Sequence, residues 1–142
     1  MGCAVSVDIK VRGYHLDIYH HVNNGRYLEF LEEGRWDYFD QHRFIELFES
    51  RNLAFVVANI NISYRRPAYA GEIIRVVTRM EKIGNKSAQM KQEVWLLELG
   101  ATTQLIADAI VTFCLMDSAT QKSVPIEGEV RQVLEGMLSE GL

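Results

Sequence analysis

The sequence predicts an α+β fold in which a strongly curved, antiparallel five-stranded sheet wraps around one long central helix. Three observations predict it. Apolar residues alternate with polar ones near the N-terminus, a helical spacing follows, and from residue 53 onward the apolar period is two over four successive segments. The connections between these segments are short, which favours antiparallel pairing of successive strands. A chain of 142 residues fits one domain, so we assign residues 1–142 to a single unit.

The first strand is expected over residues 4–12. Apolar residues stand at every second position and share one face: Val5, Val7, Ile9 and Val11. The opening stretch MGCAVS also matches the pattern for N-myristoylation at Gly2, with Cys3 as a site for palmitoylation. Because the same residues run directly into a predicted strand and the short motif has many false matches, we expect no lipid anchor.

The central helix is expected to begin at Asn23 or Asn24, whose side chains can accept hydrogen bonds from the unpaired amides of a first turn. Charges recur every three or four positions, and apolar side chains occupy most of the remaining circumference: Tyr27, Leu28, Phe30, Leu31, Trp36 and Tyr38. So wide an apolar surface predicts a helix largely enclosed by the core or by a second subunit. A short second helix is expected around Phe44, Leu47 and Phe48.

Four strands are expected next, over residues 53–66, 72–83 and 87–99 and in a last strand that reaches Asp117. In the first of them one face is predicted to hold Val56, Ala58, Ile60, Ile62 and Tyr64. In the last, one face is predicted to hold Leu105, Ala107, Ala109, Val111, Phe113 and Leu115. Beyond Pro125, helical spacing of Val130, Val133, Leu134, Met137 and Leu138 predicts an amphipathic terminal helix.

Bulk properties disfavour several classes of protein. The net charge of −4 does not favour nucleic acid as a partner. Cys3 and Cys114 are far apart, which favours a reduced compartment, and the N-terminus lacks the features of a signal peptide. No apolar run approaches the roughly 18 residues that span a bilayer. We therefore expect a cytoplasmic protein without stable membrane association. Adjacent His20 and His21 lack a third spaced ligand, so no metal or cofactor is expected.

The segment YHLDIYHHVNNGRYLEFLEE, residues 14–33, resembles the signature of hotdog-fold acyl thioesterases of the 4-hydroxybenzoyl-CoA thioesterase group. NINISYRRPAYAGE resembles the group's second-strand segment, GNKS its next hairpin, and ADAIVTFCLMD with TQKSVPIEGE its last strand and exit loop. The likeness covers about residues 7–135. It implies a hotdog fold and hydrolysis of fatty acyl-CoA thioesters. Long acyl chains are implied because VRGYHLD, RYLEFLEE and YRRPA match bacterial long-chain enzymes of the group.

The resemblance places the catalytic carboxylate at Asp17. Thioester hydrolysis needs an activated water or a carboxylate nucleophile, and donors for the charge that develops on the carbonyl oxygen. Asp17 would serve as general base or as nucleophile. The donors would be the backbone N–H groups of Asn23, Asn24 and Gly25, because a helix N-terminus presents unpaired amides. His21 is expected to position Asp17, with direct proton transfer as the alternative.

Two positions depart from the family's pattern. His20 stands where many relatives carry glycine, and His15 stands where some carry a second acidic residue. Glu33 is kept as a reserve catalytic carboxylate, since some hotdog thioesterases place theirs on the central helix.

Arg66, Lys86 and Ser87 are the favoured contacts for the phosphates of coenzyme A, ahead of Arg65 and Lys82. Coenzyme A would enter as part of the substrate and not as a cofactor. The resemblance and an expected free edge strand both imply a homodimer or homotetramer with active sites between subunits.

Two other classes of function compete with thioester hydrolysis. A hotdog hydratase or dehydratase would show a His-centred motif with a proline-rich turn or an Asp-x-Asn-Pro-x-His pattern, and the sequence has neither. A non-catalytic module that binds acyl thioesters would need no carboxylate, so Asp17 beside a helix start argues against it.

Overall fold

The structure is a computed structural model that describes residues 4–140. Gly2 and Cys3 of the lipidation pattern lie outside the described residues. The secondary structure elements are β1 (Val5–Lys10), α1 (Asn24–His42), α2 (Phe44–Ser50), β2 (Leu53–Tyr64), β3 (Ile73–Ile83), β4 (Ser87–Glu98), β5 (Ala101–Asp117) and α3 (Gly128–Glu140). Among them, no helix has the length and apolar character needed to cross a bilayer.

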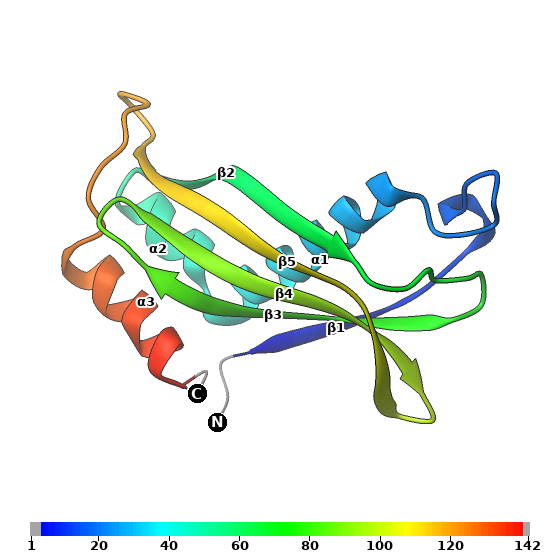
Figure 1. The fold of residues 1–142 in the computed structure, drawn as a ribbon. Helices are drawn as coiled ribbons and strands as arrows, with labels where there is room; N and C mark the ends of the chain where they lie inside the picture. The colour runs from blue at the N-terminus through cyan, green and yellow to red at the C-terminus, as the bar shows by residue number, and fades with distance from the viewer. Residues whose placement is uncertain (1–3, 141–142) are drawn as a thin grey trace.

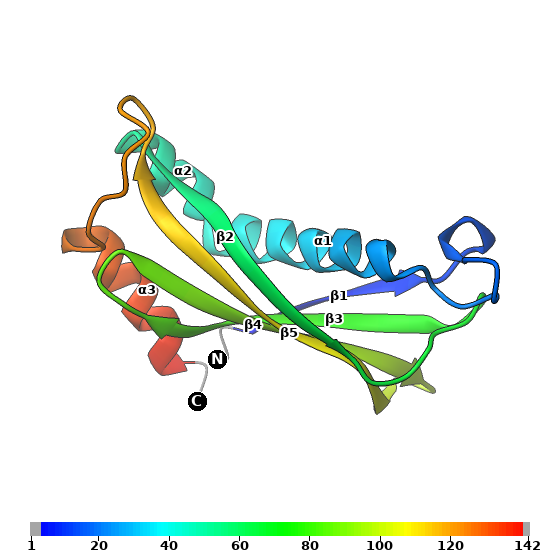
Figure 2. The ribbon, with the colours of Figure 1, turned by 45° about the horizontal axis from the view of Figure 1, so that its top comes forward.

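The strands form one antiparallel sheet of five strands in the order β1-β3-β4-β5-β2. The sheet curves around α1, which runs lengthwise along one face (Figures 1 and 2). This arrangement confirms the predicted hotdog fold. One expectation is wrong: the short connection between β2 and β3 suggested that they pair, but β2 pairs with β5 and forms an edge. A short connection therefore crosses the end of the sheet here without making a hairpin.

Helix α1 begins where the sequence predicts it. Asn23 is extended, with φ −61° and ψ 137°, and its side-chain Oδ1 accepts a hydrogen bond of 2.8 Å from the Gly25 amide. Arg43 ends the helix in the left-handed conformation, at φ 58°, and α2 starts directly after it. The core of the chain does not enclose the helix fully, because Leu28 is 41% and Trp36 54% exposed. Enclosure by a second subunit stays a prediction. Helix α1 packs mainly on β1 and β3, and a groove lies between it and β2.

β-Bulges change which residues of β2 and β5 face the core. Ala58 has no Cα partner in β5, so Val57 pairs with Phe113 and Asn59 with Thr112. The extra residue reverses the alternation, and Val56 therefore lies opposite Cys114 on the outer face, not with Ile60 as predicted. Ile106 makes a similar shift in β5, where it is buried in place of the predicted Leu105.

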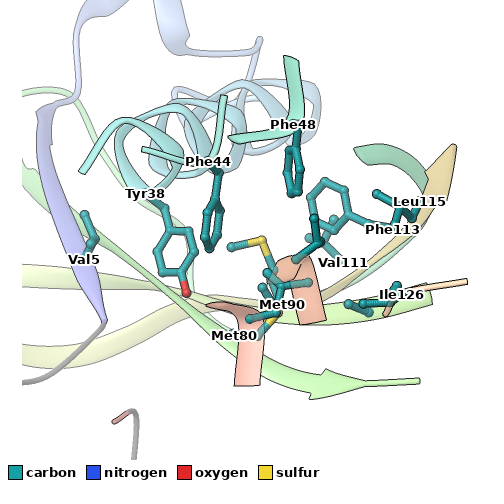
Figure 3. Packing of buried hydrophobic residues seen from close by; sticks show 13 residues of the cluster. Val5, Tyr38, Phe44, Phe48, Met80, Met90, Val111, Phe113, Leu115 and Ile126 are labelled. Atoms are coloured by element: carbon teal, nitrogen blue, oxygen red, sulfur yellow. The ribbon is translucent and has the colours of Figure 1, made fainter. Parts of the chain in front are cut away.

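Two clusters of buried side chains fill the space between the helices and the sheet. In the first, aromatic residues of α1 and α2 point onto the sheet methionines Met80 and Met90, as Figure 3 shows. Val130 and Leu134 of α3 close this cluster. The second cluster lies under the first half of α1 and contains Tyr27, Phe30, Leu31, Val11, Val22 and Ala68. It therefore supports the loop that precedes α1.

A buried glutamine fixes the middle of α1 against the sheet. The Gln92 Nε2 atom donates to the backbone oxygen of Leu31 and to Thr78 Oγ1, both at 2.8 Å. Its Oε1 accepts from the Arg35 guanidinium at 3.1 Å, so the buried amide group is fully paired. Gly34 allows this close approach, because a Cβ there would meet Thr78 Oγ1 and Val76 Cγ1 at 2.8 Å.

We predict that Gly34→Ala lowers the free energy of unfolding by about 1–3 kcal/mol, because the added methyl forces α1 away from β3. Urea denaturation measures the change. Gly136→Ala in α3 is the matched control, since a Cβ there meets nothing within 4 Å. The control should raise stability by about 0.5–1 kcal/mol through helix propensity. Equal effects of the two substitutions would show that the contact at Gly34 is not tight.

Candidate active site

The loop before α1 is a tight, hydrogen-bonded turn. Leu16 and Val22 form an antiparallel bridge, and the Asp17 amide donates to the His21 oxygen at 2.8 Å. Val22 donates in turn to Ala68 at 2.9 Å, which ties the loop to the connection between β2 and β3. His20 has a φ of 64°, a left-handed conformation that glycine adopts most easily. This backbone geometry explains why glycine suits the position that His20 occupies.

The Asp17 carboxylate is oriented by backbone amides. Its Oδ1 atom accepts from the amide of Tyr19 at 2.8 Å and from that of His21 at 3.3 Å. Within residues 4–140, Oδ2 has no hydrogen-bond partner, and the side chain is half-buried. One oxygen is thus held while the other is available to a ligand.

Asp17 lines a cleft of about 250 Å³ at the start of α1. The lining residues are Asp17, His21, Val22, Asn24, Tyr27, Tyr64, Arg65, Arg66 and Pro67. The cleft therefore brings together residues of the loop, the first turn of α1 and the end of β2. Sequence reasoning did not assign Tyr64 to the site, and its only signal is its place directly before the Arg65-Arg66-Pro67 motif.

The three amides predicted at the helix start are not equivalent. The Asn23 amide donates to the His15 oxygen at 2.9 Å, and the Gly25 amide donates to Asn23 Oδ1 at 2.8 Å. The Asn24 amide has no acceptor in the part of the chain that the structure describes, and Asn24 lines the cleft. In this structure Asn24 is thus the member of the trio whose N–H is available.

His21 contacts Asp17 through its backbone and not through its ring. The ring packs edge-on against Tyr69, with centroids 5.2 Å apart, and lines the cleft. Tyr27 and Tyr64 also line the cleft. Burial raises the pKa of Tyr27 to about 12, so its hydroxyl stays neutral. The Tyr64 hydroxyl donates to the Asn24 oxygen at 3.2 Å, which joins the end of β2 to the start of α1.

The candidate phosphate contacts lie at two ends of the subunit. Arg66 lines the cleft and pairs with Glu72 at 3.2 Å, a hydrogen bond that raises the pKa of the guanidinium. Lys86 and Ser87 belong to the hairpin between β3 and β4, beside α3 and far from the loop before α1 (Figures 1 and 2). One chain therefore does not bring Arg66 together with Lys86 and Ser87.

The reserve carboxylate Glu33 and the family departure His15 both lie outside the cleft. Glu33 is exposed on α1 and does not line it. His15 is buried, its ring packs edge-on against Phe30 at 5.0 Å, and its Nδ1 accepts from the Arg12 amide at 2.9 Å. His15 thus supports the base of the loop. Among residues 4–140, no three His, Cys, Asp or Glu side chains are grouped as metal ligands.

Known proteins that this chain resembles are thioesterases. The model of the thioesterase-like superfamily matches residues 11–134. The long-chain acyl-CoA thioesterase FadM of Escherichia coli K12 is 46% identical, and the alignment covers 94% of this chain and 99% of that protein. The acyl-CoA thioesterase YbgC of Haemophilus influenzae is 28% identical, over 78% of this chain and 79% of its own length.

A solved structure shows the same fold. The crystal structure of the probable thioesterase YbaW from Escherichia coli superposes with a TM-score of 0.85 at 46% identity, over 94% of this chain and 98% of that chain. Fold and site together define a hotdog protein with a carboxylate at a helix start. The chain belongs to the thioesterase-like superfamily.

We predict that acid destabilises the protein through His15. Burial lowers the pKa of this imidazole below its ordinary value near 6.5, so the unfolded chain binds a proton more readily than the folded one. The contribution of neutral His15 is complete above pH 6.5 and is lost as pH falls through the lower pKa of the folded state. Urea midpoints at pH 7.5, 6.0 and 5.0 measure this loss.

His15→Gln should make the urea midpoint depend less on pH, because an amide side chain does not titrate. The glutamine can still accept a hydrogen bond from the Arg12 amide. His20→Asn is the control, since Asn also tolerates a left-handed backbone and position 20 is exposed. In this control the urea midpoint should fall at low pH as it does in the unsubstituted protein. A curve for His15→Gln that matches the unsubstituted protein would contradict the assignment.

Proposed function

We propose that the protein hydrolyses long-chain fatty acyl-CoA thioesters to a free fatty acid and coenzyme A. The observation that supports it most is the presence of the free Asp17 Oδ2 and the free Asn24 amide in one cleft. The preference for long chains rests on the 46% identity to FadM. The same site offers what a thioester needs, a group that activates the attacking oxygen and a donor for the carbonyl oxygen.

The proposed reaction begins with the thioester oxygen at the Asn24 amide. As general base, Asp17 Oδ2 takes a proton from a water that attacks the carbonyl carbon, and the negative charge that forms on the oxygen is stabilised by the amide. The C–S bond then breaks, and the proton that Asp17 took from the water passes to the departing sulfur, which gives free coenzyme A and restores the carboxylate. As nucleophile, Asp17 would instead form an acyl anhydride that water hydrolyses. Both routes need the same orientation of Oδ2.

We further propose that water and these side chains suffice, so that the enzyme needs no metal ion or organic cofactor. Coenzyme A takes part only as the leaving group of the substrate. We place the reaction in the cytoplasm.

The proposed working unit is a homodimer built on β2, with a homotetramer as a further assembly. Strand β2 is an edge strand, and its outer side pairs with no other strand among residues 4–140, so it can pair with the same strand of a second copy. Antiparallel pairing about the middle of β2 would bring the Leu53 end of one protomer beside the Tyr64 end of the other. The β3–β4 hairpin lies at the Leu53 end, since Ser87 pairs with Cys114 and Leu53 with Asp117.

In this dimer, the candidate phosphate contacts that lie far apart in one subunit would come together from two subunits. The cleft of one protomer would face the hairpin with the partner's Lys86 and the partner's Ser87. Arg66 from one chain and Lys86 from the other would then both reach the phosphates of one coenzyme A.

Asp17→Asn should lower kcat by about 10²–10⁴-fold, because the amide cannot act as a base or nucleophile. The substitution keeps an Oδ1 that accepts from Tyr19 and His21, so the loop should stay folded. Release of free thiol from acyl-CoA of graded chain length measures the rate. Asp37→Asn on α1, which bonds Gln41 outside the cleft, is the control and should keep full activity. Full activity of Asp17→Asn would remove Asp17 from the chemistry.

Lys86→Ala should raise KM for acyl-CoA about 3–10-fold with kcat nearly unchanged, since a lost phosphate contact weakens substrate and transition state alike. Steady-state kinetics on acyl-CoA and on the matching acyl-pantetheine, which lacks the nucleotide phosphates, separates the two parameters. Lys91→Ala is the control, because Lys91 lies on the outer face of the sheet opposite Ile110. An unchanged KM for Lys86→Ala would exclude the partner's hairpin from the site.

A further inference from the structure

The hairpin between β3 and β4 is held by the C-terminal part of the chain, which lies beside it (Figures 1 and 2). Three successive carbonyl oxygens of the hairpin each accept a hydrogen bond from β5, from the segment after β5 or from α3. The donors and acceptors are Arg131 Nη1 to Gly84 at 3.1 Å, the Ile126 amide to Asn85 at 2.7 Å and the Leu115 amide to Lys86 at 3.0 Å. The carbonyl side of the hairpin is therefore turned toward its own subunit.

These bonds also fix the direction of the hairpin's amides. In a trans peptide unit, the N–H points opposite to the C=O. The Asn85 amide shares a peptide unit with the Gly84 oxygen, and the Lys86 amide shares one with the Asn85 oxygen, so both N–H groups point away from the subunit. Neither has an acceptor within residues 4–140. Two N–H groups next to a lysine side chain are donors that suit a phosphate.

Arg131 is the side chain among the three donors. It lies on α3, whose apolar side is buried in the first cluster, so its backbone has a fixed position. Its Nη1 also donates to the Ile126 oxygen at 3.1 Å, and its Nε donates to Glu135 at 2.9 Å. The guanidinium therefore connects the Gly84 oxygen both to α3 and to the segment before α3. The planar group of donors in arginine can make these bonds at the same time.

We propose that Arg131 is a positioning residue for the binding of coenzyme A. By holding the Gly84 oxygen, it orients the hairpin so that the Asn85 and Lys86 amides and the Lys86 ammonium face the phosphates. This inference rests on the proposed function, in which the hairpin of one protomer faces the cleft of the other. A hairpin without this bond samples more conformations, and a ligand that has to order it binds less tightly.

Arg131→Met removes the donors and keeps a long side chain that favours a helix, so α3 should stay folded. In the full chain, the substitution should raise KM for acyl-CoA about 3–10-fold with kcat nearly unchanged. KM for the matching acyl-pantetheine should not change, because that substrate lacks the nucleotide phosphates. A merely structural role of Arg131 would affect both substrates alike.

A double substitution separates positioning from direct contact. If Arg131 acts through the hairpin, Arg131→Met combined with Lys86→Ala should raise KM by less than the product of the two single effects. An independent contact between Arg131 and a phosphate would give the full product, and that result would overturn the proposal.

Hydrogen–deuterium exchange of the protein without substrate tests the support of the hairpin itself. The Gly84 amide bonds the Ser87 oxygen and the Ile126 amide bonds the Asn85 oxygen, both at 2.7 Å. In Arg131→Met both amides should exchange at least about threefold faster, because the hairpin opens more often. Mass spectrometry of the peptides that contain them measures the change.

Arg79→Met is the matched control. Arg79 lies on β3 and pairs with Glu81 at 3.5 Å, and it bonds no carbonyl of the hairpin among residues 4–140. Exchange and KM should both stay as in the unsubstituted protein. Unchanged exchange or unchanged KM for acyl-CoA in Arg131→Met would overturn the proposal.

Thiol release by the unsubstituted protein tests the proposed function by itself. An active enzyme whose KM does not depend on Arg131 refutes only this inference. Absence of thiol release refutes the hydrolase, and with it the role of Arg131 in binding the substrate.

Discussion

The site depends on two hydrogen bonds that backbone amides donate to one carboxylate oxygen of Asp17. The Tyr19 and His21 amides donate to Asp17 Oδ1, and hydrogen bonds to a charged group contribute about 1.5–3 kcal/mol each. The bonds orient Oδ2 only because the turn itself is held. The bridge between Leu16 and Val22 and the bond from Val22 to Ala68 supply that support. These bonds therefore fix the Asp17 loop relative to the segment that joins β2 and β3.

Helix α1 supplies the second fixed point. Asn23 caps its first turn, and Gln92 clamps its middle where Gly34 allows contact with β3. A helix held at two places presents the Asn24 amide to the cleft at a defined position. On its side toward β2, α1 borders a groove in which Trp36 stays 54% exposed.

Much of the fold followed from the sequence, because it depends on patterns that many residues repeat. The alternation in each strand, the cap at Asn23 and the helical spacing after residue 128 all predicted elements that the structure confirms. The errors arose where a single residue decides the geometry. The bulges at Ala58 and Ile106 exchange the residues that face the core with those that face outward, and the alternating apolar pattern does not reveal them. The placement of β2 at an edge depends on contacts between distant segments, which no local pattern encodes.

Only the part of the candidate site that is contiguous in sequence was predictable. The motif around Asp17 located the loop and the helix start, since both are contiguous in sequence. Which amide remains free was not predictable, because it depends on how Asn23 and His15 use their own groups. Tyr64 was missed because a strand residue 40 positions from Asn24 reaches the site only through folding. The separation of Lys86 from Arg66 likewise appears only in three dimensions.

A crystal structure with a non-hydrolysable acyl-CoA analogue tests the central claim most directly. The account predicts the analogue's carbonyl oxygen about 2.7–3.1 Å from the Asn24 nitrogen, with Asp17 Oδ2 facing the carbonyl carbon directly or through one water. A bound analogue whose carbonyl lies elsewhere, with the Asp17 carboxylate turned away from it, would contradict the account.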